Sequence, residues 1–351
     1  MDYIKLNSFL TEYTERNFDN QYKPVAVGRY GIRTRESIYS KELAKDYSKN
    51  KVIFQNTLTV GMGSVQIDIG ILTEDVKYSV SPAYHTYKIT GINPHYLRYC
   101  LECRNQDMFE RYVKRGSRQG KTIDLGRWLA YEIPVCETQK QQEIVSKLDF
   151  VDSLITSRRE QLTKLDELVK FRFIELFGDR WANNLGWPQK PLRDCATFYN
   201  GKAHEQVVDE NGEYVLVTSK CIVSDQREYR RTNTLLFPLQ SGDICMVMSD
   251  VPNGRALAKC MMINEDNRYT LNQRICCLRG YSLHPVFFMH ALNRHEYFLS
   301  FNDGDSQTNL RKDDLLSCPI ILPPMELQEQ FASFVEQTDK SKLCGEMEVA
   351  A

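Results

Sequence analysis

The chain has 351 residues, enough for two domains that each bury a core. No run approaches the ~18 apolar residues of a membrane span, and the N-terminus lacks a signal-peptide layout, so we expect a cytoplasmic protein. The net charge of −1 means that nucleic-acid binding would depend on local basic patches. The eleven cysteines follow no disulfide pattern. Cys100 and Cys103 form a CxxC pair without further ligands at zinc-site spacing, so we expect reduced cysteines and no metal.

An internal repeat organises the predicted elements along the chain. Residues 77–101 align without gaps on residues 268–292, with identities at Tyr78 and Tyr269, Pro94 and Pro285, and Leu101 and Leu292. Each copy predicts a strand, a turn, an X-Pro helix start and an amphipathic helix rich in aromatic residues.

The elements around these two segments also match in order. Short starts, LNSF from Leu6 and LRDC from Leu192, precede the copies. Loops with Gly and Gln, GSRQGKTIDL from Gly116 and GDSQTNLRKDDL from Gly304, follow them. An apolar strand, ending at Val135 or Leu322, then leads into a helix start that contains Gln. The order predicts a duplicated globular unit, each copy followed by a helix.

The first of these helices, over residues 141–179, is long and carries an apolar seam. Spacings of three and four residues are typical of a helix that packs lengthwise against another. The seam residues are Ile144, Leu148, Val151, Ile155, Leu162, Leu165 and Val169, with Arg158 interrupting them. At ~1.5 Å per residue, about 40 residues span on the order of 60 Å. Arg158 either pairs with an acid on the second helix to fix the register or extends into solvent.

The end of the long helix is marked by Gly178, a helix C-cap, and by the breaker-rich linker 183–189. If both helices follow the repeat they run antiparallel, and Phe331, Phe334 and Val335 supply the partner seam. We therefore divide the chain into a first globule (1–136), a long spacer helix (137–178), a second globule (179–322) and a shorter C-terminal helix with its tail (323–351).

Three segments, IPVCETQKQQEIVSKLD, LDELVKFRFIELFGD and ILPPMELQEQFASFVEQTDKSK, resemble the specificity (S) subunits of type I restriction-modification systems. The resemblance implies an α/β (α+β) fold in which two target-recognition domains are separated by an antiparallel coiled-coil spacer. It further implies that each domain reads half of a bipartite asymmetric site in double-stranded DNA. By the same resemblance, two methyltransferase subunits dock around the spacer and motor-nuclease subunits complete the complex. The alternative is a coiled-coil scaffold whose duplicated globules bind proteins.

DNA contacts are expected on loops rich in Lys, Arg, Gln and Asn, where phosphate contacts set position and bidentate contacts read bases. The candidates in the first globule are Arg33, Arg35, Asn56, Lys114, Arg115, Arg118, Gln119 and Lys121. The candidates in the second globule are Arg227, Arg230, Arg231, Asn253, Arg255, Gln307, Asn309 and Arg311. The structural alternatives are solvated surface charges and, for Gln119 and Gln307, hydrogen bonds to the adjoining strand.

Enzymatic motifs are missing from the sequence. Ser81-Pro82-Ala83-Tyr84 lacks the acidic or amide side chain and second proline of an adenine methyltransferase. No phosphate loop or metalloprotease motif is present, and His290 and His295 lie on or beside an aromatic-rich helix as expected packing residues. We therefore expect no cofactor, and chemistry that comes from partner subunits.

The second helix departs from the family pattern because it is short. We expect it to run from about Glu326 to Leu343 and to end in a tail with little seam character. On this expectation residues 162–177 of the first helix lack a partner within the chain. That stripe would then pair with another chain, or the subunit would be a silent truncated variant.

Overall fold

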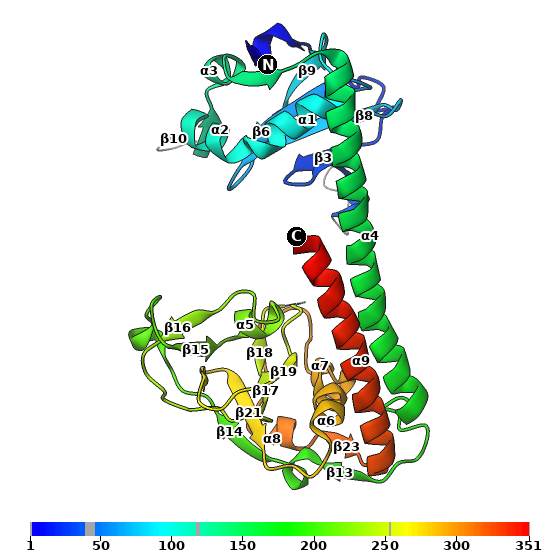
Figure 1. Ribbon diagram of the computed structural model, residues 1–351, viewed down its shortest axis with the longest axis vertical. Coiled ribbons are helices and arrows are strands. Elements are labelled where there is room, and N and C mark those ends of the chain that lie inside the picture. The colour runs from blue at the N-terminus through cyan, green and yellow to red at the C-terminus, as the bar shows by residue number, and fades with distance from the viewer. Residues whose placement is uncertain (1, 39–45, 117–119, 253, 351) are drawn as a thin grey trace. The chain divides into compact units, whose positions relative to one another are not determined.

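The computed structural model describes residues 2–38, 46–116, 120–252 and 254–350 (Figure 1). The chain forms two compact units, Met1–Leu154 and Ile155–Ala351, which we call unit one and unit two. Helix α4 (Thr138–Phe177) is continuous and contributes residues to both units.

In its described residues, unit one combines short strands with three helices that precede α4. Its strands are β1 (Asp2–Lys5), β2 (Leu10–Glu12), β3 (Val25–Gly28), β4 (Gly31–Thr34), β5 (Lys51–Ile53), β6 (Thr57–Met62), β7 (Ile67–Leu72), β8 (Tyr78–Val80), β9 (His85–Ile89), β10 (Val113–Gly116), β11 (Gly120–Ile123) and β12 (Glu132–Val135). Its helices are α1 (Pro94–Cys103), α2 (Asn105–Tyr112) and α3 (Leu125–Leu129). The main sheet has the order β2-β9-β6-β7 and is antiparallel throughout.

The core of unit one follows the two-residue period of its strands. Leu58 and Val60 of β6 point to the same face of the sheet, because alternate residues of a strand share a face. They join a cluster that includes Leu97 of α1 and Trp128 of α3, all of them fully buried. Helix α1 thus covers this face of the sheet.

Unit two repeats the same plan. Its strands are β13 (Gln189–Pro191), β14 (Thr197–Asn200), β15 (Tyr214–Val217), β16 (Arg230–Thr232), β17 (Ile244–Val247), β18 (Ser249–Asp250), β19 (Cys260–Met262), β20 (Tyr269–Leu271), β21 (Ile275–Arg279), β22 (Thr308–Asn309) and β23 (Pro319–Ile321). Its helices are α5 (Ser219–Val223), α6 (Pro285–Leu292), α7 (Glu296–Leu299), α8 (Lys312–Leu316) and α9 (Met325–Ala350), with the second part of α4. The main sheet has the order β14-β21-β17-β19.

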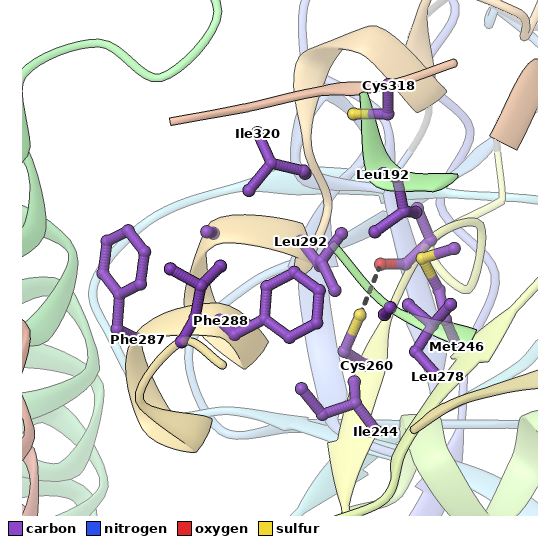
Figure 2. Close-up of a cluster of buried hydrophobic side chains, with 14 of the residues drawn as sticks. Leu192, Ile244, Met246, Cys260, Leu278, Phe287, Phe288, Leu292, Cys318 and Ile320 are labelled. Carbon is purple, nitrogen blue, oxygen red and sulfur yellow. Dashed lines mark hydrogen bonds between the residues drawn. The ribbon is translucent and has the colours of Figure 1, made fainter. Parts of the chain in front are cut away.

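The central strands of unit two are buried on both faces. Ile244 and Met246 of β17 enter the cluster shown in Figure 2, with Phe287 and Phe288 of α6, whereas the alternate residues of β17 enter a second cluster. A continuous apolar run is what a strand covered on both sides requires.

Thiols form part of both clusters. Cys245, Cys260, Cys276 and Cys277 are all buried. Burial raises the pKa of the Cys276 thiol to about 12 and holds the pKa of Cys245 well above its usual value. These thiols therefore stay protonated in the folded protein.

The predicted repeat and the α/β two-domain fold class are confirmed. The two main sheets have equivalent strand orders, and α1 and α6 both begin at the aligned prolines, Pro94 and Pro285. The aligned strands β8 and β20 also have equivalent neighbours: β8 pairs antiparallel with β5 and forms a parallel bridge between Ser79 and Pro24, and β20 pairs parallel with β15 and forms an antiparallel bridge between Thr270 and Pro238.

The two segments expected as loops contain strands instead. Residues 113–116 and 120–123 form the hairpin β10–β11, and β22 pairs with β18. Backbone pairing within the hairpin and a long-range pairing with β18 explain the difference, because each gives the extended backbone hydrogen-bond partners.

A buried glutamine explains why each spacer helix begins with a Gln-containing motif. Gln141 of α4 accepts a hydrogen bond from the Asn93 N–H (3.0 Å) and donates one to the Cys136 carbonyl (2.7 Å). Gln328 of α9 does the same with the His284 N–H and the Pro323 carbonyl, both at 2.8 Å. In each unit this side chain joins the residue before an X-Pro helix to the start of the spacer helix.

Helix α9 runs antiparallel to the second part of α4 (Figure 1). Phe331, early in α9, packs on Phe173 and Phe177 near the end of α4, with ring centroids 5.4 and 5.7 Å apart. Lys342, later in α9, pairs with Asp166 at 2.8 Å. The expectation that residues 162–177 lack a partner is therefore wrong, because α9 starts beside the end of α4 and covers this stretch first. The expected helix end near Leu343 is also wrong, since α9 continues through residues 343–350.

The predicted seam residues of α4 differ in burial. Val169 is buried with Val335 in the core of unit two. Ile155, Leu162 and Leu165 are half-buried. Ile144 is half-buried against the core of unit one. Within unit one Leu148 and Val151 are exposed, at 37 % and 48 %. The Arg158 guanidinium donates to Gln161 Oε1 on the same helix (2.8 Å).

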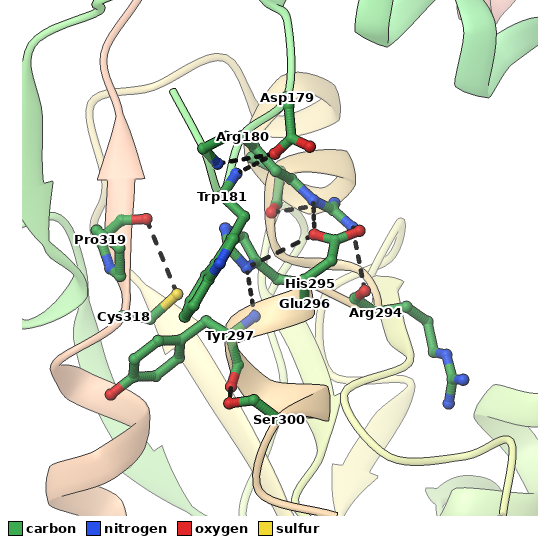
Figure 3. A network of polar contacts seen from close by, with 12 residues as sticks. Asp179, Arg180, Trp181, Arg294, His295, Glu296, Tyr297, Ser300, Cys318 and Pro319 are labelled. Atoms are coloured by element: carbon green, nitrogen blue, oxygen red, sulfur yellow. Dashed lines mark hydrogen bonds and ion pairs between the residues drawn. The ribbon is translucent and has the colours of Figure 1, made fainter. Parts of the chain in front are cut away.

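A polar network follows the end of α4 (Figure 3). Gly178 has φ +73°, which confirms the predicted C-cap. The Arg180 guanidinium donates to the His290, Ala291 and Arg294 carbonyls and contacts the Glu296 carboxylate. These carbonyls lie at the end of α6 and just after it, where a helix lacks internal partners. Arg180 thus fastens the chain after α4 to the core of unit two.

The two histidines expected as packing residues are confirmed in that role. The His290 ring packs edge-on against Phe331 (5.2 Å between centroids). His295 is 1 % exposed, and its Nδ1 accepts from the Tyr297 N–H (3.0 Å) at the start of α7. Burial, aided by the Arg180 charge, lowers the pKa of His295 to about 4. A neutral imidazole fits this bond, because Nδ1 can accept only when it is unprotonated.

Candidate nucleic-acid interface

The first candidate surface in unit one is the β10–β11 hairpin. Lys114 pairs with Asp124 (2.8 Å), and Lys121 donates to the Ser64 carbonyl and lies 5.2 Å from the Phe109 ring centroid. The backbone of Arg115 pairs with that of Lys121. The predicted contacts Arg118 and Gln119 lie outside the described residues. The two lysines are therefore held in place by their own unit.

Asp124 connects the hairpin to the next helix. Its carboxylate accepts from the Arg127 N–H (3.3 Å) and so caps α3. The hydrogen bond from Lys114, with that N–H second, holds the pKa of Asp124 below its usual value. The hairpin is thus anchored at its base.

A second candidate surface in unit one is the β3–β4 hairpin. The Tyr30 side chain is 70 % exposed, and the guanidinium carbons of Arg29 and Arg33 lie 5.8 and 5.2 Å from its ring centroid. Arg35 lies just after β4, 5.2 Å from the Tyr47 ring centroid. Sequence reasoning selected the two later arginines but missed Arg29 and Tyr30. The run RYGIR, an aromatic residue between basic ones, is the signal that would have found them.

Asn56 occupies a turn whose backbone conformation favours asparagine. It lies between β5 and β6 with φ 61°, a left-handed conformation that Asn adopts more readily than most residues. Its N–H donates to the Leu72 carbonyl (2.7 Å), and its carbonyl accepts from the Ile89 N–H (2.9 Å). The side chain is exposed, so the turn leaves it available to a ligand.

In unit two, strand pairing brings two predicted segments together. Ser249 of β18 lies opposite Asn309 of β22. The Asp250 carboxylate accepts from the Ala256 N–H (2.6 Å) and the Leu257 N–H (3.0 Å), which closes the turn that carries the exposed Arg255. The predicted contact Asn253 lies outside the described residues. Gln307, Asn309 and Arg311 extend along and beyond β22, all exposed.

A cavity of ≈ 350 Å³ lies beside this pairing. Most of its lining residues have polar side chains, and they come from β17, β18, the start of α5, the β20–β21 turn and the residue before β22. The residues are Thr218, Ser219, Val247, Ser249, Asp250, Val251, Asn272, Gln273, Arg274, Ile275 and Gln307. The turn residues Asn272, Gln273 and Arg274 were not selected from the sequence. Their neighbours come from strands distant in the chain, so no local pattern marks them.

The remaining predicted arginines of unit two lie away from this cavity's lining. The Arg231 guanidinium donates to the Gly212 carbonyl (3.2 Å) and the Tyr229 hydroxyl (3.3 Å), which gives it a structural role. Arg230, at the start of β16, and Arg227 are exposed.

Comparison with known proteins decides the family. The model of the type I restriction modification DNA specificity domain matches the chain twice, over residues 6–167 and 184–344. The chain belongs to this family. The two matches coincide with the two copies of the internal repeat, and the resemblance found in the sequence is confirmed.

One solved S subunit shares the fold of this specificity subunit. The S subunit of a type I restriction-modification system from M. genitalium superposes with a TM-score of 0.55 at 14 % identity, covering 99 % of this chain and 92 % of that one. The HsdS subunit from Thermoanaerobacter tengcongensis matches with a TM-score of 0.38 at 16 % identity, over 100 % of this chain and 92 % of that one. The subunit matches no curated protein.

The described residues of the specificity subunit include neither a candidate metal cluster nor a membrane-spanning helix. They contain no cluster of three or more His, Cys, Asp or Glu side chains placed to hold a metal ion. Across those same stretches of chain, no helix combines the length and apolar character needed to cross a bilayer.

Proposed function

We propose that the two units of this specificity subunit each read one half of a bipartite, asymmetric DNA sequence. The observation that carries the proposal is the double match to the DNA specificity domain, one match for each copy of the repeat. Each unit carries exposed arginine and amide side chains of the kind that base reading and phosphate contact require, such as Arg33 and Asn56 of unit one and Arg255 and Asn309 of unit two. Asymmetry follows because the copies share strand order but few side chains.

We further propose that methyltransferase subunits dock on the subunit and carry out the chemistry, with motor-nuclease subunits in the complete complex. The exposed apolar side chains Leu148, Val151 and Leu168 of α4 support a role for this helix in protein contact. Because these three side chains are apolar, this part of the α4 surface differs from a surface that contacts DNA. Docking and DNA reading would therefore use separate residues.

A methylome tests both proposals. The chain is expressed with its methyltransferase partner in a host without DNA methylation, and modified bases are detected by single-molecule sequencing. We expect a new two-part N6-methyladenine motif with a constant gap that disappears when this chain is omitted. An assembled complex that methylates nothing would contradict the proposal and identify a silent variant.

The scaffold alternative makes a different prediction in solution. A DNA reader loses affinity with rising salt, roughly in proportion to the phosphates it contacts, and prefers one duplex sequence. A protein-binding scaffold shows neither behaviour. Titration of the purified chain with fluorescent duplex at 50 and 200 mM salt separates the two.

A further inference from the structure

The turn between β20 and β21 places an arginine at the mouth of the polar cavity in unit two. Arg274 is exposed and lines the cavity with Gln273 and Gln307. Within the described part of the chain, no residue forms a hydrogen bond or ion pair with its guanidinium. Nearby arginines differ: Arg279 is paired with Asp243 at 2.6 Å, and Arg294 donates to the Leu257 carbonyl.

The backbone beneath Arg274 is held firmly. The Asn272 N–H donates to the Val217 carbonyl (3.2 Å), and the Arg274 carbonyl accepts from the Met248 N–H (3.0 Å). Gly201 approaches so closely that a Cβ there would lie 1.9 Å from the Asn272 carbonyl oxygen. The turn therefore presents its side chains from a fixed position, which geometric recognition of a base requires.

Arg274 adopts this position at a cost. Its φ is +66°, a left-handed conformation that is unfavourable for an L-residue and that glycine would adopt freely. Backbone strain of this kind persists where the surrounding structure holds it and is concentrated at functional sites. The Oδ1 atom of Asn272 is also buried with no donor among the described residues, another feature typical of a site that awaits a ligand.

We propose that Arg274 reads the guanine of one G·C pair in the half-site recognised by unit two. The guanidinium offers two parallel donors that match the O6 and N7 acceptors of guanine, the commonest specific contact in the major groove. Gln273 and Gln307 border the same cavity and face the neighbouring base pairs. This inference rests on the proposed function and adds the base identity and the residue that determines it.

The aligned turn of unit one cannot make this contact. The repeat places Ser81, Pro82 and Ala83 opposite Asn272, Gln273 and Arg274. None of these three side chains carries two donors. Guanine recognition by this turn is therefore confined to one half of the site, and unit one must read its half with other residues.

Selection from a random duplex library tests the inference. Purified wild-type chain and the variants Arg274→Lys and Arg274→Gln each select duplexes, which are then sequenced. Lysine keeps the positive charge but loses the two-donor fork. We expect both variants to lose the preference for guanine at one position of one half-site by roughly 10- to 100-fold, with the other positions unchanged.

Two matched variants serve as controls in the same selection. Arg268→Gln removes an exposed arginine outside the cavity, which is paired with Glu265, and should leave the selected sequence unchanged. Arg255→Gln, on the adjoining turn, should weaken binding to all sequences alike if that side chain contacts phosphate. Equal thermal midpoints for wild type and variants show that each protein is folded.

The outcomes distinguish a failure of the Arg274 inference from a failure of the proposed function. If wild type selects no sequence, the proposed function fails and the inference fails with it. If wild type selects a sequence that both Arg274 variants select equally well, only the inference is overturned. If Arg274→Lys binds normally while Arg274→Gln weakens every sequence alike, Arg274 contacts phosphate and base reading is refuted.

Discussion

The buried glutamine at the start of α9 offers a sharp test of how each unit is fastened to its helix. We consider Gln328→Leu, which keeps the approximate volume of the side chain and removes both of its hydrogen bonds. The His284 N–H and the Pro323 carbonyl then remain without partners, since Gln328 occupies both at 2.8 Å and is 2 % exposed.

The expected loss follows from these two groups. Each buried polar group left unpaired costs about 1–3 kcal/mol. Burying a leucine in place of the amide returns about 1–2 kcal/mol. The free energy of unfolding of unit two should therefore fall by about 0–5 kcal/mol, with a central value of about 2.5 kcal/mol.

Native-state hydrogen exchange measures this loss unit by unit. Amides of α6 should exchange faster in Gln328→Leu, whereas those of α1 should not change. Gln141→Leu should give the converse, because Gln141 makes the equivalent bonds in unit one.

The control is Gln337→Leu, an exposed glutamine on the same helix, expected to stay within about 0.5 kcal/mol of wild type. The reasoning is refuted if Gln328→Leu costs no more than this control.

Three further predictions concern unit two. Because the pKa of His295 is lowered to about 4, its contribution to the free energy of unfolding is complete above pH 6.5. This contribution falls by on the order of 3 kcal/mol as the pH drops toward 4. Urea unfolding at pH 7.5 and 4.5 should show the loss, and His295→Asn should reduce it. Phe331→Ala should cost about 3–5 kcal/mol, seen as a lower thermal midpoint, since the ring is fully buried. Asp250→Ala should speed amide exchange at Ala256 and Leu257 at least tenfold while the melting of α6 stays unchanged.

Much of the fold was predictable because its signals are local. The X-Pro helix starts at Pro94 and Pro285 and the strands before them can be recognised from short windows, and their order revealed the duplication. The long helix was equally clear, since its residues favour a helix over its whole length. The family resemblance depended on the same local segments.

The errors arose where distant segments determine the outcome. Strand β23 pairs with β13, just after α4, and this returns the chain to the end of α4 before α9 begins. The sequence indicated Phe331 as a seam residue, but without that pairing it could not show that Phe331 meets Phe173 near the end of α4. The turn at Arg274 was missed for the same reason, because β18, β22 and α5 surround it only in the folded unit.

The buried thiols of unit two have a practical consequence. Only a thiolate reacts readily with alkylating reagents, and Cys245, Cys260 and Cys277 are enclosed and protonated in the native state. Cys103 of unit one is exposed and open to modification at once. In the wild-type protein, alkylation at Cys103 therefore provides an immediate reference signal. The slower alkylation at Cys245 reports each opening of unit two without any introduced label.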